Sequence, residues 1–119
     1  MAQQDAQHDR RIDYIEMAAT DIAATKRFYG DLFGWKFTDY GPEYTSFEDG
    51  RLNGGFYNAP AVKPGTVLVV IFAVDLEAME QRVRSAKGKI VKPIFSFPGG
   101  RRFHFADPSG NELAVWSDR

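Results

Sequence analysis

Cysteine is absent from the 119 residues of this chain, which excludes disulfide bonds, zinc sites built on thiolates and a cysteine nucleophile. Long hydrophobic runs are also absent. The longest apolar stretch, residues 67–74, has the length of a strand and falls far short of the ~20 residues that a membrane helix needs. Neither sign of charge dominates, because 15 lysine and arginine residues are matched by 16 aspartate and glutamate residues. This balance argues against nucleic acid or an anionic membrane as a partner.

The rest of the composition is that of one ordinary globular domain. Hydrophobic residues make up 44% of the chain and charged residues 26%, both near the average for soluble proteins. Residues 1–10 are polar and lack the apolar centre of a signal peptide, so we expect them to form a disordered or frayed tail. A cytoplasmic location follows as an expectation.

Two segments of the chain repeat one plan of a strand, a helix and three strands. In the first, Asp21 is expected to cap a helix that ends at Gly34, and in the second Asp75 and Gly88 take these roles at the same separation. The strands are expected at residues 11–17, 35–40, 44–48 and 54–57, and again at 66–74, 89–97, 101–106 and 111–116. The pattern predicts an α+β domain with βαβββ modules at 11–57 and 66–117, joined by a linker at 58–65.

The residues around the first helix resemble a known signature. Ala19-Thr-Asp21, followed by Lys-Arg-Phe-Tyr-Gly-Asp-Leu-Phe-Gly-Trp at 26–35, is similar to the first-helix motif of the vicinal oxygen chelate superfamily. That superfamily includes glyoxalase I, bleomycin and fosfomycin resistance proteins and extradiol dioxygenases. Val-Asp-Leu-Glu at 74–77, Gly-Lys-Ile-Val at 88–91 and Asp-Pro-Ser-Gly-Asn at 107–111 match its second module.

The resemblance extends over roughly residues 11–117 and carries several expectations. It implies two βαβββ modules whose mixed sheet curls around a small-molecule cavity, with the helices outside, and a homodimer with cavities near its interface. Many members hold one divalent metal through one residue from each of four strands. In this chain Lys87 stands where the family commonly has a second glycine before Gly88, which predicts an altered turn there.

The four positions that the resemblance assigns to metal ligands fall on Tyr14, Ser46, Leu68 and Ala114. Leucine and alanine have no ligating atom, and tyrosine and serine are poor ligands without a histidine or carboxylate beside them. We therefore predict that the usual metal site is missing and that the protein needs no cofactor. This counts against glyoxalase I and extradiol dioxygenase chemistry.

Strand alternation predicts which other side chains share the cavity with these positions. Glu16 follows Tyr14, while Tyr44 and Glu48 flank Ser46. Trp116 and Glu112 flank Ala114, and Arg102 and His104 share one face of the next strand. The predicted ligand-binding residues are Tyr14, Tyr44, Ser46, Glu48, Arg102 and Trp116. An aromatic cavity with a few polar groups is typical of a small-molecule site.

Two of the lining residues are candidates for catalysis, each with a structural alternative. His104 has the pKa range of a general base, but a histidine between two phenylalanines is also a common half-buried structural residue. Glu16 would accept a proton if it were desolvated, or else it faces solvent or pairs with an arginine. Arg102, with its neighbour Arg101, would clamp a carboxylate or phosphate, or else forms a solvated rim. Trp116 would stack on a planar ligand or belong to the core.

Three functional hypotheses remain open from the sequence. The first is a glyoxalase-like or bleomycin-resistance-like protein that binds an aromatic or cationic small molecule without a metal. The second is a metal-independent or atypically metallated lyase or isomerase of the glyoxalase type. The third is an inert or partner-binding member that kept the fold and lost the chemistry. The acidic and aromatic lining favours the first.

Overall fold

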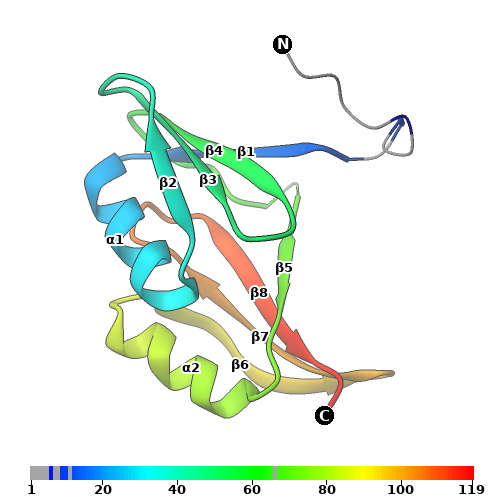
Figure 1. Cartoon of the computed structure of the whole chain (residues 1–119). Helices are drawn as coiled ribbons and strands as arrows, with labels where there is room; N and C mark the ends of the chain where they lie inside the picture. The colour runs from blue at the N-terminus through cyan, green and yellow to red at the C-terminus, as the bar shows by residue number, and fades with distance from the viewer. Residues whose placement is uncertain (1–5, 7–8, 11, 66) are drawn as a thin grey trace.

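The computed structural model of the chain describes residues 6, 9–10, 12–65 and 67–119. It contains two helices and two four-stranded sheets (Figure 1). The first module comprises β1 (Tyr14–Ala19), α1 (Ile22–Phe33), β2 (Lys36–Asp39), β3 (Tyr44–Glu48) and β4 (Asn53–Asn58). The second comprises β5 (Val69–Phe72), α2 (Leu76–Ser85), β6 (Lys89–Phe97), β7 (Gly100–Ala106) and β8 (Glu112–Ser117).

Both sheets have the same topology, which confirms the predicted α+β fold of two βαβββ modules. The strand orders are β1-β4-β3-β2 and β5-β8-β7-β6, with the first and last strands of each module parallel and the other pairs antiparallel. No strand pair joins the two sheets within the described residues, so the sheets stay open to each other. β1 and β5 are therefore both edge strands.

The predicted strands agree in number and order but differ at some ends. β1 starts at Tyr14 and runs to Ala19 because it pairs with β4 from Asn53 to Asn58. β5 is shorter than the predicted 66–74 because only Val69–Phe72 pairs with β8. Arg11, Thr66 and most of the predicted tail lie outside the described residues. The linker at 58–65 and the tail at 1–10 stay predictions.

The predicted helix starts are confirmed, because Asp21 accepts from the backbone N–H of Ala24 and Asp75 from that of Ala78, each at 3.0 Å. These bonds satisfy donors that a helix start leaves free. α1 ends as predicted at Gly34, which is left-handed with φ of 74°.

The prediction that α2 ends at Gly88 is wrong. The helix ends at Ser85, and Lys87 takes the left-handed position with φ of 72°. The backbone N–H of Gly88 then bonds to the carbonyl of Val83 at 2.9 Å, which closes the turn. Gly88 itself is needed for space, since a Cβ there would lie 2.7 Å from Cγ1 of Val83.

The core is aromatic and is shared by both modules. The Tyr29 ring of α1 stacks on Trp35 with centroids 4.6 Å apart and on Phe56 of β4 at 5.3 Å. Phe28, on the same helix, contacts Phe105 of β7 with centroids 6.0 Å apart. α1 therefore packs on both sheets, and both helices lie on one side of the molecule in Figure 1. The alternate face of each sheet is left without a helix.

The turn at 107–111 links the second module to the first. Its buried Asp107 carboxylate accepts from Tyr29 Oη at 2.9 Å. Asn111 donates its side-chain N–H to the carbonyl of Ala18 at 2.6 Å. The backbone N–H of Thr20 donates to Ser109 Oγ at 2.8 Å. The motif that resembles the family's second module therefore holds the modules together.

Candidate functional site

The helix-free face of the first sheet carries a chain of three hydrogen-bonded side chains from β1 and β3. The hydroxyl oxygens of Tyr14 and Tyr44 lie 2.6 Å apart, and Tyr44 donates to Oε2 of Glu16 at 2.9 Å. Strand alternation predicted that Tyr14 and Glu16 share one face of β1 and that Tyr44 and Ser46 share one face of β3. It did not predict the hydrogen bonds of Tyr44 with Tyr14 and Glu16. These side chains meet across β4, which lies between β1 and β3.

Gly55 of β4 makes this meeting possible. It pairs with Glu16 on one side and Ser46 on the other. A Cβ at Gly55 would overlap the hydroxyl oxygen of Tyr44 and would lie 2.8 Å from that of Tyr14. The bare backbone therefore provides the floor on which the two tyrosines lie. Sequence reasoning missed this role, although a glycine inside a strand often marks a close approach.

The environment of Tyr44 keeps its hydroxyl protonated. Burial is the largest cause that raises the pKa of Tyr44, and the hydrogen bonds with Tyr14 and Glu16 raise it further. A carboxylate accepts hydrogen bonds and has none to donate. Tyr44 consequently donates its hydroxyl proton to Glu16, and Tyr14 donates its own to the Tyr44 oxygen.

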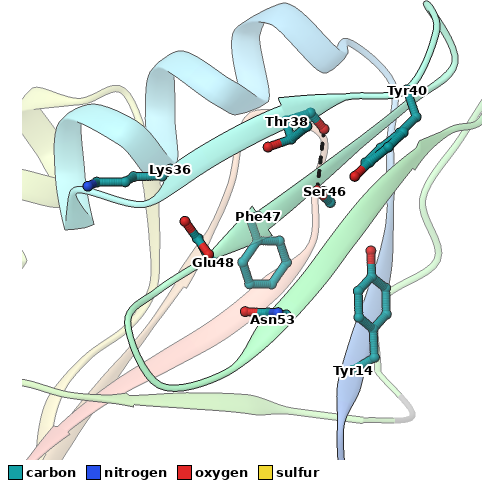
Figure 2. A pocket seen from close by; sticks show the side chains of 8 residues that line it. All are labelled: Tyr14, Lys36, Thr38, Tyr40, Ser46, Phe47, Glu48 and Asn53. Carbon is teal, nitrogen blue, oxygen red and sulfur yellow. Dashed lines mark hydrogen bonds between the residues drawn. The ribbon is translucent and has the colours of Figure 1, made fainter. Parts of the chain in front are cut away.

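A pocket of about 450 Å³ opens beside Tyr14 (Figure 2). Its lining comes from all four strands of the first sheet and from the turn after β2: Tyr14, Lys36, Thr38, Tyr40, Ser46, Phe47, Glu48 and Asn53. Ser46 Oγ donates to the carbonyl of Thr38 at 3.4 Å. Figure 2 shows the hydroxyl groups of Tyr14 and Tyr40 directed toward Ser46, and the Lys36 amine directed away from them. Lys36, Thr38, Tyr40 and Asn53 were not predicted as lining residues.

The helix-free face of the second sheet carries the other predicted residues. Only 5% of the His104 side chain is exposed, and its Nδ1 lies 2.8 Å from Oε2 of Glu112. The Arg102 guanidinium lies over the rings of Phe95 and Phe97, 5.4 and 5.7 Å from their centroids. His104 Nε2 and Arg102 Nε are buried without a hydrogen-bond partner among the described residues.

Trp116 lies on the same face, between two phenylalanines. Its ring is 5.4 Å from that of Phe72 and 6.4 Å from that of Phe97, measured between centroids. The Glu112 partner of His104 was placed on this face by alternation but was not recognised as a hydrogen-bond partner. The sequence did indicate this bond. A short turn joins β7 to β8 and pairs His104 with Ala114, and Glu112 lies two residues before Ala114 on the same face of β8.

The predicted site residues thus form two groups, one on each sheet. Tyr14, Glu16, Tyr44, Ser46 and Glu48 line the first face, and Arg102, His104 and Trp116 line the second. Between β1 and β5 lies a wide hollow of about 1810 Å³ with many apolar side chains, among them Ile15, Met17, Val69 and Ile71. The ligand-binding and catalytic roles of all these residues stay predictions.

The residues at the four expected metal-ligand positions do not fit a divalent cation. Tyr14 Oη is hydrogen-bonded to Tyr44, and Ser46 Oγ donates to a backbone carbonyl. Ala114 is fully buried and, like Leu68, has no donor atom in its side chain. No group of three or more histidine, aspartate or glutamate side chains is placed to hold a metal within the part of the chain that the structure describes. Dependence on a metal has to be measured.

Comparison with known proteins gives a match over most of the chain. A family model described as Glyoxalase/Bleomycin resistance protein/Dioxygenase superfamily matches residues 11–115. The anthracycline biosynthesis protein DauV of Streptomyces sp. (strain C5) is 34% identical over 125 residues, which cover 87% of this chain. This chain spans only 45% of the length of that relative.

Solved structures share the fold. A glyoxalase-related enzyme from Fulvimarina pelagi superposes with a TM-score of 0.77 at 22% identity, covering 91% of this chain and 88% of its own. The fosfomycin resistance protein FosX from Mesorhizobium loti also gives a TM-score of 0.77, at 13% identity, with 91% and 92% of the two chains covered. At these identities the likeness concerns the fold alone. Neither helix among the described residues is long and apolar enough to cross a membrane.

Proposed function

This chain belongs to the Glyoxalase/Bleomycin resistance protein/Dioxygenase superfamily, and from that premise we propose that it binds an aromatic or cationic small molecule without a divalent metal. The observation that carries the proposal is the pocket beside Tyr14. There a pair of tyrosines and a glutamate occupy the face where the resemblance expects metal ligands.

The side chains of the two faces support this ligand class. Tyr14 and Tyr40 border the first pocket, and Trp116 is half-buried on the second sheet beside Phe97. Aromatic side chains stack on planar ligands, and their ring faces attract cations. Glu48 and Lys36, which pair across β2 and β3, add one charge of each sign to the lining of the first pocket. The name of DauV places that relative in anthracycline biosynthesis, and anthracyclines are planar aromatic compounds.

We also propose that the protein is a homodimer whose cavities lie near the interface. β1 and β5 are edge strands, and apolar side chains stand exposed along β5 and just before it, with Val67 78% and Val70 44% exposed. An exposed apolar edge of this kind is a site for pairing with another chain. The relative DauV is about twice as long as the segment it shares with this chain, which leaves room for a second module pair in a single protein.

One observation favours the alternative of a metal-independent lyase or isomerase. The Glu112 carboxylate holds His104 through Nδ1, and Nε2 carries no hydrogen bond to any described residue. A carboxylate that orients a histidine in this way fixes the tautomer with its free lone pair on Nε2, as a general base requires. This arrangement would serve a reaction that begins with removal of a proton from the substrate. For either function we propose a cytoplasmic location.

Calorimetric titration of the chelator-treated protein with 1,8-dihydroxyanthraquinone tests the leading function. We expect saturable binding, and we expect Tyr14→Phe and Tyr40→Ala, both at the pocket, to weaken it. Tyr57→Phe is the matched control, because Tyr57 lies on the same face outside the pocket. Absence of binding to this compound, together with no binding to aromatic amines, would contradict the proposal and favour the member that lost its chemistry. Proton release or isomerisation in a bound dicarbonyl compound, lost in His104→Ala, would favour the lyase or isomerase.

A further inference from the structure

We propose that Glu16 and Tyr44 hold Tyr14 as a hydrogen-bond acceptor, so that the pocket beside it selects ligands that carry an ammonium group next to an aromatic or apolar body. This inference rests on the proposed function, because it names the ligand class of the first-sheet pocket. It assigns Glu16 and Tyr44 a positioning role, while Tyr14 makes the contact with the ligand.

The direction of each hydrogen bond in the series Tyr14–Tyr44–Glu16 follows from its last member, the Glu16 carboxylate. The Glu16 carboxylate only accepts, so Tyr44 spends its single proton on Oε2 of Glu16 at 2.9 Å. The short contact of 2.6 Å between the two tyrosine oxygens then requires Tyr14 to be the donor. With that proton used, Tyr14 has only lone pairs left for a ligand in the pocket.

Neighbouring groups on this side of the pocket have the same polarity. Ser46 Oγ donates its proton to the carbonyl of Thr38, so only its lone pairs are available to a ligand. Glu48 also lines the pocket, but on the side of Lys36 (Figure 2), its partner across β2 and β3, so these two residues together add no net charge. Lys36, which would repel an ammonium group, extends away from the tyrosines in Figure 2.

The rings supply the second half of the recognition. Tyr14 and Tyr40 both border the pocket, so an ammonium group at Tyr14 Oη would lie beside tyrosine rings. Cations are attracted to aromatic ring faces, and hydrogen bonds from a charged donor are stronger than those from a neutral one. A carboxylate or phenolate at Tyr14 would instead meet only lone pairs. Tyr40 and Asn53 can present either polarity and do not change this order.

Three aromatic probes of similar size distinguish a cationic donor, a neutral hydroxyl group and an anionic acceptor: benzylammonium, benzyl alcohol and benzoate. Binding is followed by the backbone amide shifts of Ser46, Asn53 and Gly55 in NMR spectra of the whole chain. We expect benzylammonium to bind about tenfold more tightly than benzyl alcohol, as a charge-assisted hydrogen bond would provide. We expect benzoate to bind more weakly than the alcohol.

Variants of the hydrogen-bond chain distinguish positioning from simple packing. Tyr44→Phe keeps the ring and frees the Tyr14 proton, so the preference for benzylammonium over benzyl alcohol should fall to about twofold or less. Glu16→Gln can donate to Tyr44 and reverse the chain, and it should lower the preference in the same way. Tyr57→Phe removes a hydroxyl from the same strand face outside the pocket and should keep the full preference.

Each remaining outcome overturns the inference. Equal affinities for the three probes, a preference for benzoate, or no shift with any probe would show that the pocket does not select donors. An unchanged preference in both Tyr44→Phe and Glu16→Gln, with native spectra, would remove the positioning role. Binding of 1,8-dihydroxyanthraquinone without any preference among the three probes would support the proposed function and contradict only this inference.

Discussion

Tyr29 Oη donates to Oδ2 of Asp107 across 2.9 Å, and this buried bond joins the first helix to the turn between β7 and β8. The same carboxylate accepts from the backbone N–H groups of Ser109 at 3.0 Å and Asn111 at 2.9 Å. Burial, and then the charge and hydrogen bond of Asp107, raise the pKa of Tyr29 well above its usual value. Tyr29 therefore stays a donor, and the two modules share one polar anchor inside an aromatic core.

Loss of this anchor is expected to destabilise the fold. Tyr29→Phe keeps the stacked ring but leaves a buried carboxylate with one partner fewer, which costs about 1–3 kcal/mol in the free energy of unfolding. Urea unfolding monitored by tryptophan fluorescence measures it. Tyr40→Phe, at a side chain that is 65% exposed, should change stability by less than about 0.5 kcal/mol.

The same variant has a pH signature. Because the folded pKa of Tyr29 is raised, its contribution to stability is complete below the unfolded value of about 10 and is lost as the pH rises further. The deficit of Tyr29→Phe relative to the native chain should therefore shrink above pH ~10. An equal stability of the two proteins at neutral pH would contradict the anchoring role.

Lys87→Gly should make the protein more stable. Lys87 has φ of 72°, a conformation that costs a residue with a Cβ about 1–2 kcal/mol and costs glycine nothing. The added freedom of glycine in the unfolded chain offsets part of this, so a net gain of about 0.5–1 kcal/mol is expected. Gly88→Ala is the opposite control, since its Cβ would lie 2.7 Å from Val83. A loss of stability in Lys87→Gly would mean that the lysine side chain has an unrecognised role in this turn.

Gly55→Ala should displace the tyrosine pair. The new methyl group would overlap the Tyr44 hydroxyl, so one or both rings must leave the sheet. We expect the benzylammonium preference to disappear and stability to fall by about 1–3 kcal/mol. Amide and tyrosine ring NMR signals report the rearrangement. A variant with native signals and full selectivity would show that the floor at Gly55 is not required.

Val70→Lys should disrupt the proposed dimer. Val70 lies on the edge strand β5 and is 44% exposed, and a lysine on an edge strand opposes pairing with another chain. Sedimentation equilibrium should give twice the chain mass of 13.4 kDa for the native protein and a lower mass for the variant. Val91→Lys, at a 41% exposed residue of β6 on the opposite edge of the same sheet, should leave the native mass unchanged, because the proposed interface is at β5. A native mass of one chain would refute the dimer.

Local features of this fold could be predicted from the sequence because they depend on neighbours along the chain. The Asp21 and Asp75 caps need only the three residues that follow them, and the shared face of Tyr14 and Glu16 needs only strand alternation. The left-handed Lys87 was missed because glycine was expected to take that conformation, whereas Gly88 is set by packing against Val83 and Phe28.

Contacts between strands could not be predicted in the same way. The Tyr14–Tyr44 contact depends on strand order and register across β4, which alternation within one strand does not fix, whereas the His104–Glu112 bond lies within one hairpin. The separation of the two sheets depends on how α1 packs against both, through Phe28 on Phe105 and Tyr29 on Phe56. Strand alternation therefore predicted which side chains share a face, whereas the arrangement of the two faces within one chain lay beyond it, and the binding roles of these residues stay predictions.

Thermal unfolding of the chelator-treated chain, repeated with nickel, zinc, manganese, iron and cobalt ions and then with 1,8-dihydroxyanthraquinone, tests the central claim most directly. A ligand at a hundred times its dissociation constant adds about 2.7 kcal/mol of stability, which shifts the Tm of a domain of this size by several degrees. We predict no such shift with any metal and a shift with the aromatic compound. A shift of that size with one metal, and none with the aromatic compound, would contradict that claim.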